Sequence, residues 1–321
     1  MGEMNVLITG ADGFIGTKLT DNLAKNNFNI YALTFNKNNI SEILKKYKNV
    51  KAIDLDLNRN ISLNKVLNGY KFDVIIHAAF VTSYESFNEI NESHINVNLI
   101  STSKFIQYAV KNNVGKFIFL SSAGIYYNQK KENINSEYRK LRTDKFYFLA
   151  KSIIEKIIRF YYVNQFNTKF IILRVGTIFG ENERESDSRR TLSIPTQILK
   201  KVKSNKIIKI NTLNVFRDYS HIDNISYAIS RFIEYKNLKH LIYNVGSDSV
   251  FGISDIFKIL LKNDIEFNYE IRKKEYCNIV LETHQNRSAL DLGKLKKIIR
   301  EYPVINFEDS IIKTYWKLWL N

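Results

Sequence analysis

Short apolar runs alternate with longer stretches of helical periodicity through the first half of the chain. Six runs are predicted to be strands: "NVLIT" (5–9), "NIYAL" (29–33), "VKAID" (50–54), "DVIIH" (73–77), "KFIFL" (116–120) and "KFIIL" (169–173). Runs without polar alternation are typical of parallel strands buried on both faces. Segments 17–26, 94–113 and 146–165 carry the helical spacing. The alternation predicts a Rossmann-like, doubly wound α/β fold with a parallel sheet.

The alternation of strands and helices becomes less regular after about residue 175, where the charged segment "GENERESDSRR" (180–190) is followed by shorter elements. We expect residues 1–178 to form the main domain, with about 215–245 returning to it. Residues 179–214 and 246–321 are then expected to form a smaller C-terminal lobe that completes a cleft.

The composition is that of an ordinary globular protein: 45% of the 321 residues are apolar and 25% are charged. A single cysteine, Cys277, excludes an internal disulfide. The chain shows neither a signal peptide nor a run long enough for a membrane span, so we expect a cytoplasmic protein with no membrane insertion. The net charge of +16 comes from dispersed lysines, which we attribute to composition rather than to a nucleic-acid surface.

The segment "TGADGFIG" (9–16) follows the first strand and opens the first helix. Gly10, Gly13 and Gly16 allow a tight turn and a close approach to a pyrophosphate, while the helix N-terminus supplies N–H donors. A turn without a ligand would use the same glycines. The position between strand and helix favours dinucleotide binding.

The end of the second strand bears on the choice between NAD and NADP, because an acidic residue there accepts from the 2′-hydroxyl of NAD. "ALTFNKNN" offers Thr34, Asn36 and Lys37 but no carboxylate. Lys37 could meet the 2′-phosphate of NADP or could be a solvated loop lysine. The cofactor is therefore NADP or NAD, with NADP favoured. Asp56 could receive the adenine amino group, and Asp54 is an alternative.

A tyrosine, a lysine and a serine carry the candidate chemistry. "YFLAK" places Tyr147 and Lys151 four residues apart on one helix face. An ammonium there favours the phenolate of a tyrosine with an ordinary pKa of about 10. Tyr147 could then exchange a proton with a carbinol while hydride passes to or from nicotinamide. Ser122 follows the fifth strand and could bond the reacting oxygen, although Ser121 competes for this role.

Together these segments resemble the extended short-chain dehydrogenase/reductases, the NAD-dependent epimerase/dehydratase group that acts on nucleotide sugars. The resemblance covers nearly the whole chain. It rests on "TGADGFIG", "HAAF" (77–80), Asn98, "SSAGIYY" (121–127), "YFLAK" (147–151), "LRVGTIFG" (173–180), "RDYSHIDN" (217–224) and "YNVGS" (243–247).

The resemblance implies roles for individual residues. Ser122, Tyr147 and Lys151 would form the catalytic triad, and Lys151 would also hold the nicotinamide ribose. Arg217 and Arg287 would bind the substrate diphosphate, which suits planar guanidinium groups. The implied cofactor-binding residues are Gly10, Gly13, Phe14, Ile15, Gly16, Thr34, Asn36, Lys37, Asp56, Leu57, Ala78, Ala79, Tyr147 and Lys151, and the implied substrate-binding residues are Ser122, Ala123, Gly124, Thr177, Arg217 and Arg287.

Departures from the family pattern narrow the reaction. Ala123 and Gly124 stand where the 4,6-dehydratases carry an acidic pair, so we do not expect dehydration. Tyr127, Thr177 and Asn224 also differ and leave the sugar undefined. The prediction is an NAD(P)-dependent enzyme that reduces a keto-sugar nucleotide at carbon 4. An NAD-retaining sugar-nucleotide 4-epimerase is the alternative, and a non-catalytic dinucleotide-binding protein is a more distant one.

The remaining polar residues receive structural interpretations. The five histidines are scattered, so no metal site is expected. His77 is expected to support the cofactor cleft and His221 to pack beside the lobe. Arg184, Arg189 and Arg190 could gate an anionic substrate, but we expect a solvated loop. The resemblance also implies a homodimer formed through the helices around 96–110 and 146–165.

Overall fold

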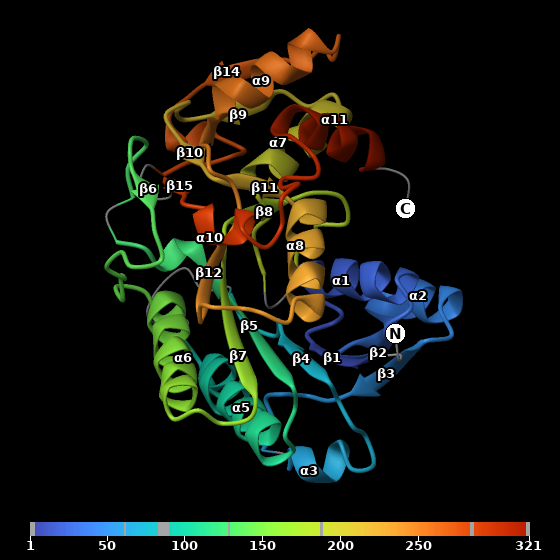
Figure 1. Cartoon of the computed structure of the whole chain (residues 1–321). Helices are drawn as coiled ribbons and strands as arrows, with labels where there is room; N and C mark the ends of the chain where they lie inside the picture. Colours follow the sequence, from blue (N-terminus) through green and yellow to red (C-terminus); the bar gives the residue numbers. More distant parts are fainter. Residues whose placement is uncertain are drawn as a thin grey trace.

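The computed structural model describes residues 4–60, 62–82, 90–127, 129–186, 189–282 and 286–318. Its largest element is a seven-stranded parallel sheet (Figure 1). The strand order of this sheet is β12-β7-β5-β4-β1-β2-β3. The strands are β1 (Asn5–Thr9), β2 (Asn29–Thr34), β3 (Val50–Asp54), β4 (Val74–His77), β5 (Lys116–Ser122), β7 (Lys169–Val175) and β12 (Ile242–Val245). All six predicted strands lie in this sheet, which confirms the predicted fold class.

Each face of the sheet has its own hydrophobic core, because successive strand residues point to opposite sides. In β5, Ile118 and Leu120 belong to one core, whereas Phe117 and Phe119 belong to the other. The first core is covered by α1 (Phe14–Lys25), α2 (Ser41–Lys46), α8 (Ile222–Glu234) and α10 (Gly293–Lys296), and the second by α3 (Leu63–Val66), α5 (Thr102–Lys111) and α6 (Phe146–Val163) (Figure 1). Burial on both sides explains why the strands lack polar alternation.

The predicted helix over 94–113 forms as three consecutive pieces. These are α4 (Glu92–Ile95), the π-helical segment η3 (Asn96–Ser101) and α5. Within η3, the side chain of Asn98 accepts a hydrogen bond from the Val81 amide at 2.8 Å and donates one to its carbonyl at 3.0 Å. Asn98 therefore fixes the chain that leaves β4 toward the carboxyl edge of the sheet.

A third hydrophobic core lies in a lobe above the carboxyl edge of the sheet (Figure 1). Its helices are α7 (Ile194–Lys203), α9 (Ile253–Lys262) and α11 (Phe307–Lys317), and β9 (Ile208–Ile210) pairs with β14 (Tyr269–Ile271). Three further pairs are β8 (Thr177–Phe179) with β11 (Tyr219–His221), β10 (Phe216–Arg217) with β13 (Phe251–Gly252), and β6 (Ile134–Asn135) with β15 (Ala289–Leu290). The remaining short helices are η1 (Lys37–Ile40), η4 (Ala123–Ile125) and η5 (Lys274–Tyr276). No helix in the described part of the chain has the length and apolarity needed to cross a membrane.

Candidate active site

The glycine turn lies at the carboxyl end of β1 and packs against the chain that follows β4. Gly10 has a φ of 64°, and a Cβ on it would lie 2.8 Å from the Cα of Ala79. A Cβ on Gly16 would collide with the Gly10 carbonyl oxygen. No side chain of the described residues caps the first turn of α1, which begins at Phe14. A tight glycine turn before uncapped helix amides fits a dinucleotide pyrophosphate.

His77 stabilises this turn through contacts of both its ring nitrogens with threonine hydroxyls. Its Nδ1 lies 3.0 Å from the Thr9 hydroxyl and its Nε2 lies 2.9 Å from the Thr102 hydroxyl. The Thr9 hydroxyl also accepts a hydrogen bond from the Ala79 amide at 3.2 Å. Burial, together with repulsion by Lys151, lowers the pKa of His77 to about 3. A neutral histidine bonded at both nitrogens has a structural role, and it fixes the segment carrying Ala78 and Ala79.

The residues predicted to contact the adenosine lie around the ends of β2 and β3. Thr34 is buried and donates to the Asp54 carboxylate at 3.2 Å, while the Lys37 ammonium lies 3.4 Å from the other Asp54 oxygen. Asp56, just before Leu57, accepts from the Asn58 amide at 2.9 Å. The side chains of Lys37 and Asp56 thus already have partners, and neither role predicted for them is tested by this arrangement.

The two neighbouring serines at the end of β5 have different surroundings. The Ser121 hydroxyl is buried and donates to the Glu155 carboxylate at 2.6 Å. The Ser122 side chain accepts from the Gly124 amide at 3.1 Å, and it interacts with Tyr147, opposing the rise that burial causes in the pKa of that tyrosine. Ser122 is therefore the serine in contact with the candidate proton donor, and Ser121 belongs to the buried interior.

Ser121 is part of a buried polar cluster that the sequence analysis did not identify. Arg174 forms two hydrogen bonds to the Glu155 carboxylate, at 2.6 and 3.0 Å, and donates to the Glu137 carbonyl at 2.9 Å. Beside it, the Tyr126 hydroxyl donates to Asn244 at 2.5 Å. Arg174 interrupts the otherwise apolar run "KFIILRV" (169–175), and that interruption is the signal from which a buried ion pair could have been expected.

Tyr147 and Lys151 share one face of α6, as the spacing predicts, but the Lys151 ammonium lies closer to other groups. The Lys151 ammonium donates to the Leu120 carbonyl at 2.6 Å and lies 3.5 Å from the centre of the Phe80 ring, against 5.8 Å from that of Tyr147. Burial holds the pKa of Lys151 well below its usual value. Burial also raises the pKa of Tyr147, opposed by the Ser122 hydrogen bond and by Arg189 and Arg287. The lysine is turned toward Phe80 and the strand, and its expected effect on the pKa of Tyr147 stays a prediction.

Two arginines of the lobe, Arg217 and Arg287, are the residues predicted to bind the substrate diphosphate. Arg217 lies in β10, and Arg287 lies close enough to Gly124 that a Cβ there would be 3.6 Å from its Nε. Burial, with repulsion from Arg217, lowers the pKa of Arg287 to about 9. Asp218, next to Arg217 in the chain, is buried and accepts from the Thr177 hydroxyl at 2.8 Å, and burial raises its pKa to about 6. An anion bound between the guanidinium groups would relieve their repulsion.

The charged loop after β8 folds back onto the glycine turn. Arg184 donates to the backbone carbonyl of Asp12, and the guanidinium of Arg189 lies 5.3 Å from the centre of the Phe14 ring. Arg189 is also paired with the buried carboxylate of Glu183. These two arginines are therefore anchored, contrary to the expected solvated loop, whereas Arg190 is exposed.

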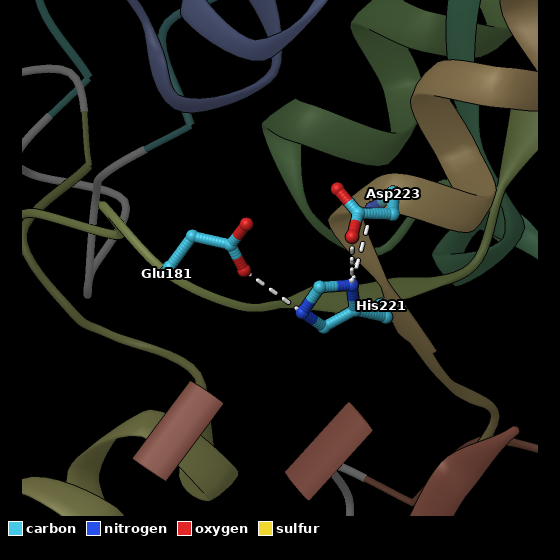
Figure 2. Close-up of side chains that lie close together, drawn as sticks. All are labelled: Glu181, His221 and Asp223. Atoms are coloured by element: carbon cyan, nitrogen blue, oxygen red, sulfur yellow. Dashed lines mark hydrogen bonds and ion pairs between the residues drawn. The ribbon is translucent and has the colours of Figure 1, made fainter. Parts of the chain in front are cut away.

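Figure 2 shows a second cluster of titratable groups, Glu181, His221 and Asp223, with ligand atoms within 4.8 Å of one another. His221 Nε2 lies 2.9 Å from Glu181, Lys18 pairs with both carboxylates, and Lys313 pairs with Asp223. Although burial opposes it, His221 and Lys18 lower the pKa of Glu181 to about 2. Two lysines already compensate the carboxylates, so the donor set does not favour a metal ion and instead ties α1 to α8 and α11.

Comparisons with known proteins show which proteins this chain is similar to. Residues 6–246 match the NAD dependent epimerase/dehydratase family. The UDP-glucose 4-epimerase of Pisum sativum is 24% identical over 76% of this chain and 77% of that protein. The GDP-6-deoxy-D-talose 4-dehydrogenase of Aggregatibacter actinomycetemcomitans is 25% identical over 85% of this chain and 84% of that protein. The fold is similar to that of UDP-glucuronic acid 4-epimerase from Bacillus cereus in complex with UDP-glucuronic acid and NAD, with a TM-score of 0.79, 21% identity, and coverage of 98% of this chain and 99% of that one. None of these supports the predicted preference for NADP.

Proposed function

We propose that this chain, which belongs to the NAD-dependent epimerase/dehydratase family, is an NAD-dependent 4-epimerase of UDP-sugars. The observation that carries the proposal is the convergence of Ser122, Tyr147 and Arg287 near Gly124. A Cβ on Gly124 would lie 3.1 Å from the Ser122 Oγ and 3.6 Å from the Arg287 Nε, and both of these side chains oppose the rise in the pKa of Tyr147. A UDP-glucose 4-epimerase matches most of this chain, and this match favours a UDP-sugar over other substrates. This reverses the order of the two reactions that the sequence analysis weighed.

Tyr147 and Ser122 handle the proton of the sugar hydroxyl. Bound NAD would be held by the glycine turn, and it supplies the acceptor and later the donor of a hydride at carbon 4. The Tyr147 phenolate takes the proton of the 4-hydroxyl as hydride leaves carbon 4, and the resulting Tyr147 hydroxyl returns that proton when the 4-ketone is reduced. Ser122, which interacts with Tyr147, orients the reacting oxygen. Donors fixed in advance at that oxygen lower the barrier because they need no reorganisation.

Arg217 and Arg287 are proposed to bind the diphosphate of the substrate. Their guanidinium groups repel each other, and Asp218 supplies one nearby carboxylate. A diphosphate brings further negative charge and accepts forked hydrogen bonds. Since both arginines come from lobe segments, diphosphate binding would draw the lobe toward β5 and place the sugar over Ser122.

A carbon-4 keto-sugar reductase is the second candidate, and one observation favours it. Burial raises the pKa of Tyr147, so the phenol retains its proton, which is the form that reduces a ketone. A relative that is a 4-dehydrogenase of a GDP-sugar is compatible with this chemistry. The 4-epimerase needs both protonation states of Tyr147, and the reductase needs only one.

The two candidates can be separated by following products. Purified protein is incubated with UDP-glucose, UDP-N-acetylglucosamine or UDP-glucuronic acid plus NAD, and the sugar products are resolved by NMR. The 4-epimerase predicts a mixture of 4-epimers with no net change in dinucleotide, abolished in Tyr147→Phe. Consumption of NADPH with a 4-keto-sugar nucleotide, and no epimerisation, would establish the reductase instead. Absence of both reactions across UDP-, GDP- and dTDP-sugars would contradict the proposal.

A further inference from the structure

The adenosine end of the cofactor site has a carboxylate that does not come from β2. The Oδ2 atom of Asp12, in the middle of the glycine turn, accepts a hydrogen bond from the Asn36 amide at 2.9 Å. Asn36 is the second residue after β2, the place where the acidic residue that reads the ribose of NAD usually stands. The turn thus brings to this place the functional group that the strand lacks.

The side chain of Asn36 is already used elsewhere. Its Oδ1 atom accepts from the Asn38 amide at 3.0 Å and caps η1. Asp12 Oδ1, by contrast, receives no hydrogen bond from the part of the chain that the structure describes. The Asp12 carboxylate therefore retains an acceptor atom beside the end of β2, while its other oxygen fixes its orientation.

Neither of the two nearby cations, Lys37 and Arg184, pairs with the side chain of Asp12. The Lys37 ammonium is paired at 3.4 Å with Asp54, and both side chains are more than half exposed, so this ion pair is weak. Arg184 approaches the same turn, but it donates to the backbone carbonyl of Asp12 and not to its side chain. The Asp12 carboxylate therefore stands at this edge with both nearby cations bound to other groups.

We propose that Asp12 selects NAD over NADP by accepting a hydrogen bond from the 2′-hydroxyl of the adenosine ribose. A carboxylate accepts from a hydroxyl, but it repels a 2′-phosphate and has no proton to donate to it. This inference rests on the dinucleotide site of the proposed function. It reverses the preference that the residues of β2 alone suggest, because those residues do not include the acid supplied by the turn.

The test measures dinucleotide choice without requiring a substrate. Charcoal-treated protein is equilibrated with equal excess concentrations of NAD and NADP and passed through a desalting column. The retained dinucleotides are released by denaturation and quantified by mass spectrometry. Asp12→Asn removes the charge but keeps an acceptor for the Asn36 amide, and Asp21→Asn is the matched control, an aspartate of α1 that contacts Lys46 and Tyr47 instead.

We expect the wild type and Asp21→Asn to retain mainly NAD, and Asp12→Asn to lower the ratio of NAD to NADP at least about tenfold, as loss of a charge at a binding site commonly does. Equal melting temperatures would show that the variant is folded. A ratio changed less than about twofold in Asp12→Asn, or a wild type that retains mainly NADP, would overturn the inference while leaving the dinucleotide site intact. Retention of neither dinucleotide by the wild type would overturn the proposed function together with the inference.

Discussion

Two polar regions meet at the end of β5, and they differ in how completely their groups are paired. In the buried cluster of Ser121, Glu155 and Arg174, each side chain has a close partner among the others. In the region around Ser122, Tyr147 and Arg287, burial raises the pKa of Tyr147, and burial together with repulsion from Arg217 lowers the pKa of Arg287 to about 9. Buried polar groups that satisfy one another stabilise a fold, whereas those that remain strained or repelled mark a place for a ligand.

The largest expected effect is on stability, from the buried cluster. Arg174→Leu leaves the Glu155 carboxylate buried without its partner, so we expect the free energy of unfolding to fall by about 3–5 kcal/mol. Urea unfolding followed by circular dichroism measures this. The double variant Arg174→Leu/Glu155→Leu should recover part of the loss, since no unpaired charge remains. A loss below about 1 kcal/mol in the single variant would show that the two regions do not differ as described.

In the other region, the largest effect is on turnover. Tyr147→Phe removes the proton donor, and we expect kcat to fall by about 100-fold to 10,000-fold while dinucleotide binding and melting temperature stay near those of the wild type. Tyr126→Phe is the matched control, because its hydroxyl lies in the buried interior bonded to Asn244. That variant should lose stability and keep its turnover. The reverse pattern would exchange the roles of the two tyrosines.

Asp218→Asn tests whether the buried Asp218 carboxyl destabilises the fold when it ionises, through the pH dependence of the melting temperature. Because burial raises the pKa of Asp218 from 3.8 to about 6, its contribution to stability is fully present below about pH 4 and is lost as the pH rises through 6. The variant should therefore be more stable than the wild type at pH 7 to 8, by up to about 3 kcal/mol, and the gain should vanish near pH 4. Melting curves across this range measure the difference. A gain independent of pH would contradict the shifted pKa.

A smaller effect is expected for Arg287→Lys, which keeps the charge but loses the planar fork. The dissociation constant for UDP should rise about tenfold in isothermal titration, because a lysine cannot make the paired hydrogen bonds of a guanidinium. Arg231→Lys, an exposed arginine of α8 paired with Glu234, is the control and should bind UDP like the wild type. Equal affinities of the two variants would remove Arg287 from the diphosphate site.

The sequence predicts the sheet and the glycine turn because both depend on local patterns. Continuous apolar runs mark strands buried on both sides, and Gly10 and Gly16 are required by the backbone itself. Ser121 and Ser122 could not be told apart, since alternation along β5 places neighbours on opposite faces without saying which face carries Glu155. The contact of Lys151 with Phe80 could not be predicted, because the spacing of the lysine from Tyr147 says nothing of a ring that comes from the segment after β4. Asp12 was passed over because it stands inside the turn rather than at the end of β2.

The contrast between the two serines is most directly tested by their alanine variants, assayed with the UDP-sugar that the wild type converts fastest. Ser122→Ala should lower kcat by about 10-fold to 100-fold, through loss of a hydrogen bond that orients the reacting oxygen, with the melting temperature unchanged. Ser121→Ala should lower the melting temperature by several degrees, because Glu155 loses a buried partner, and leave kcat within about twofold. A Ser121→Ala variant that is stable but inactive, beside an active Ser122→Ala, would contradict the assignment of the active site to the Ser122 side of β5.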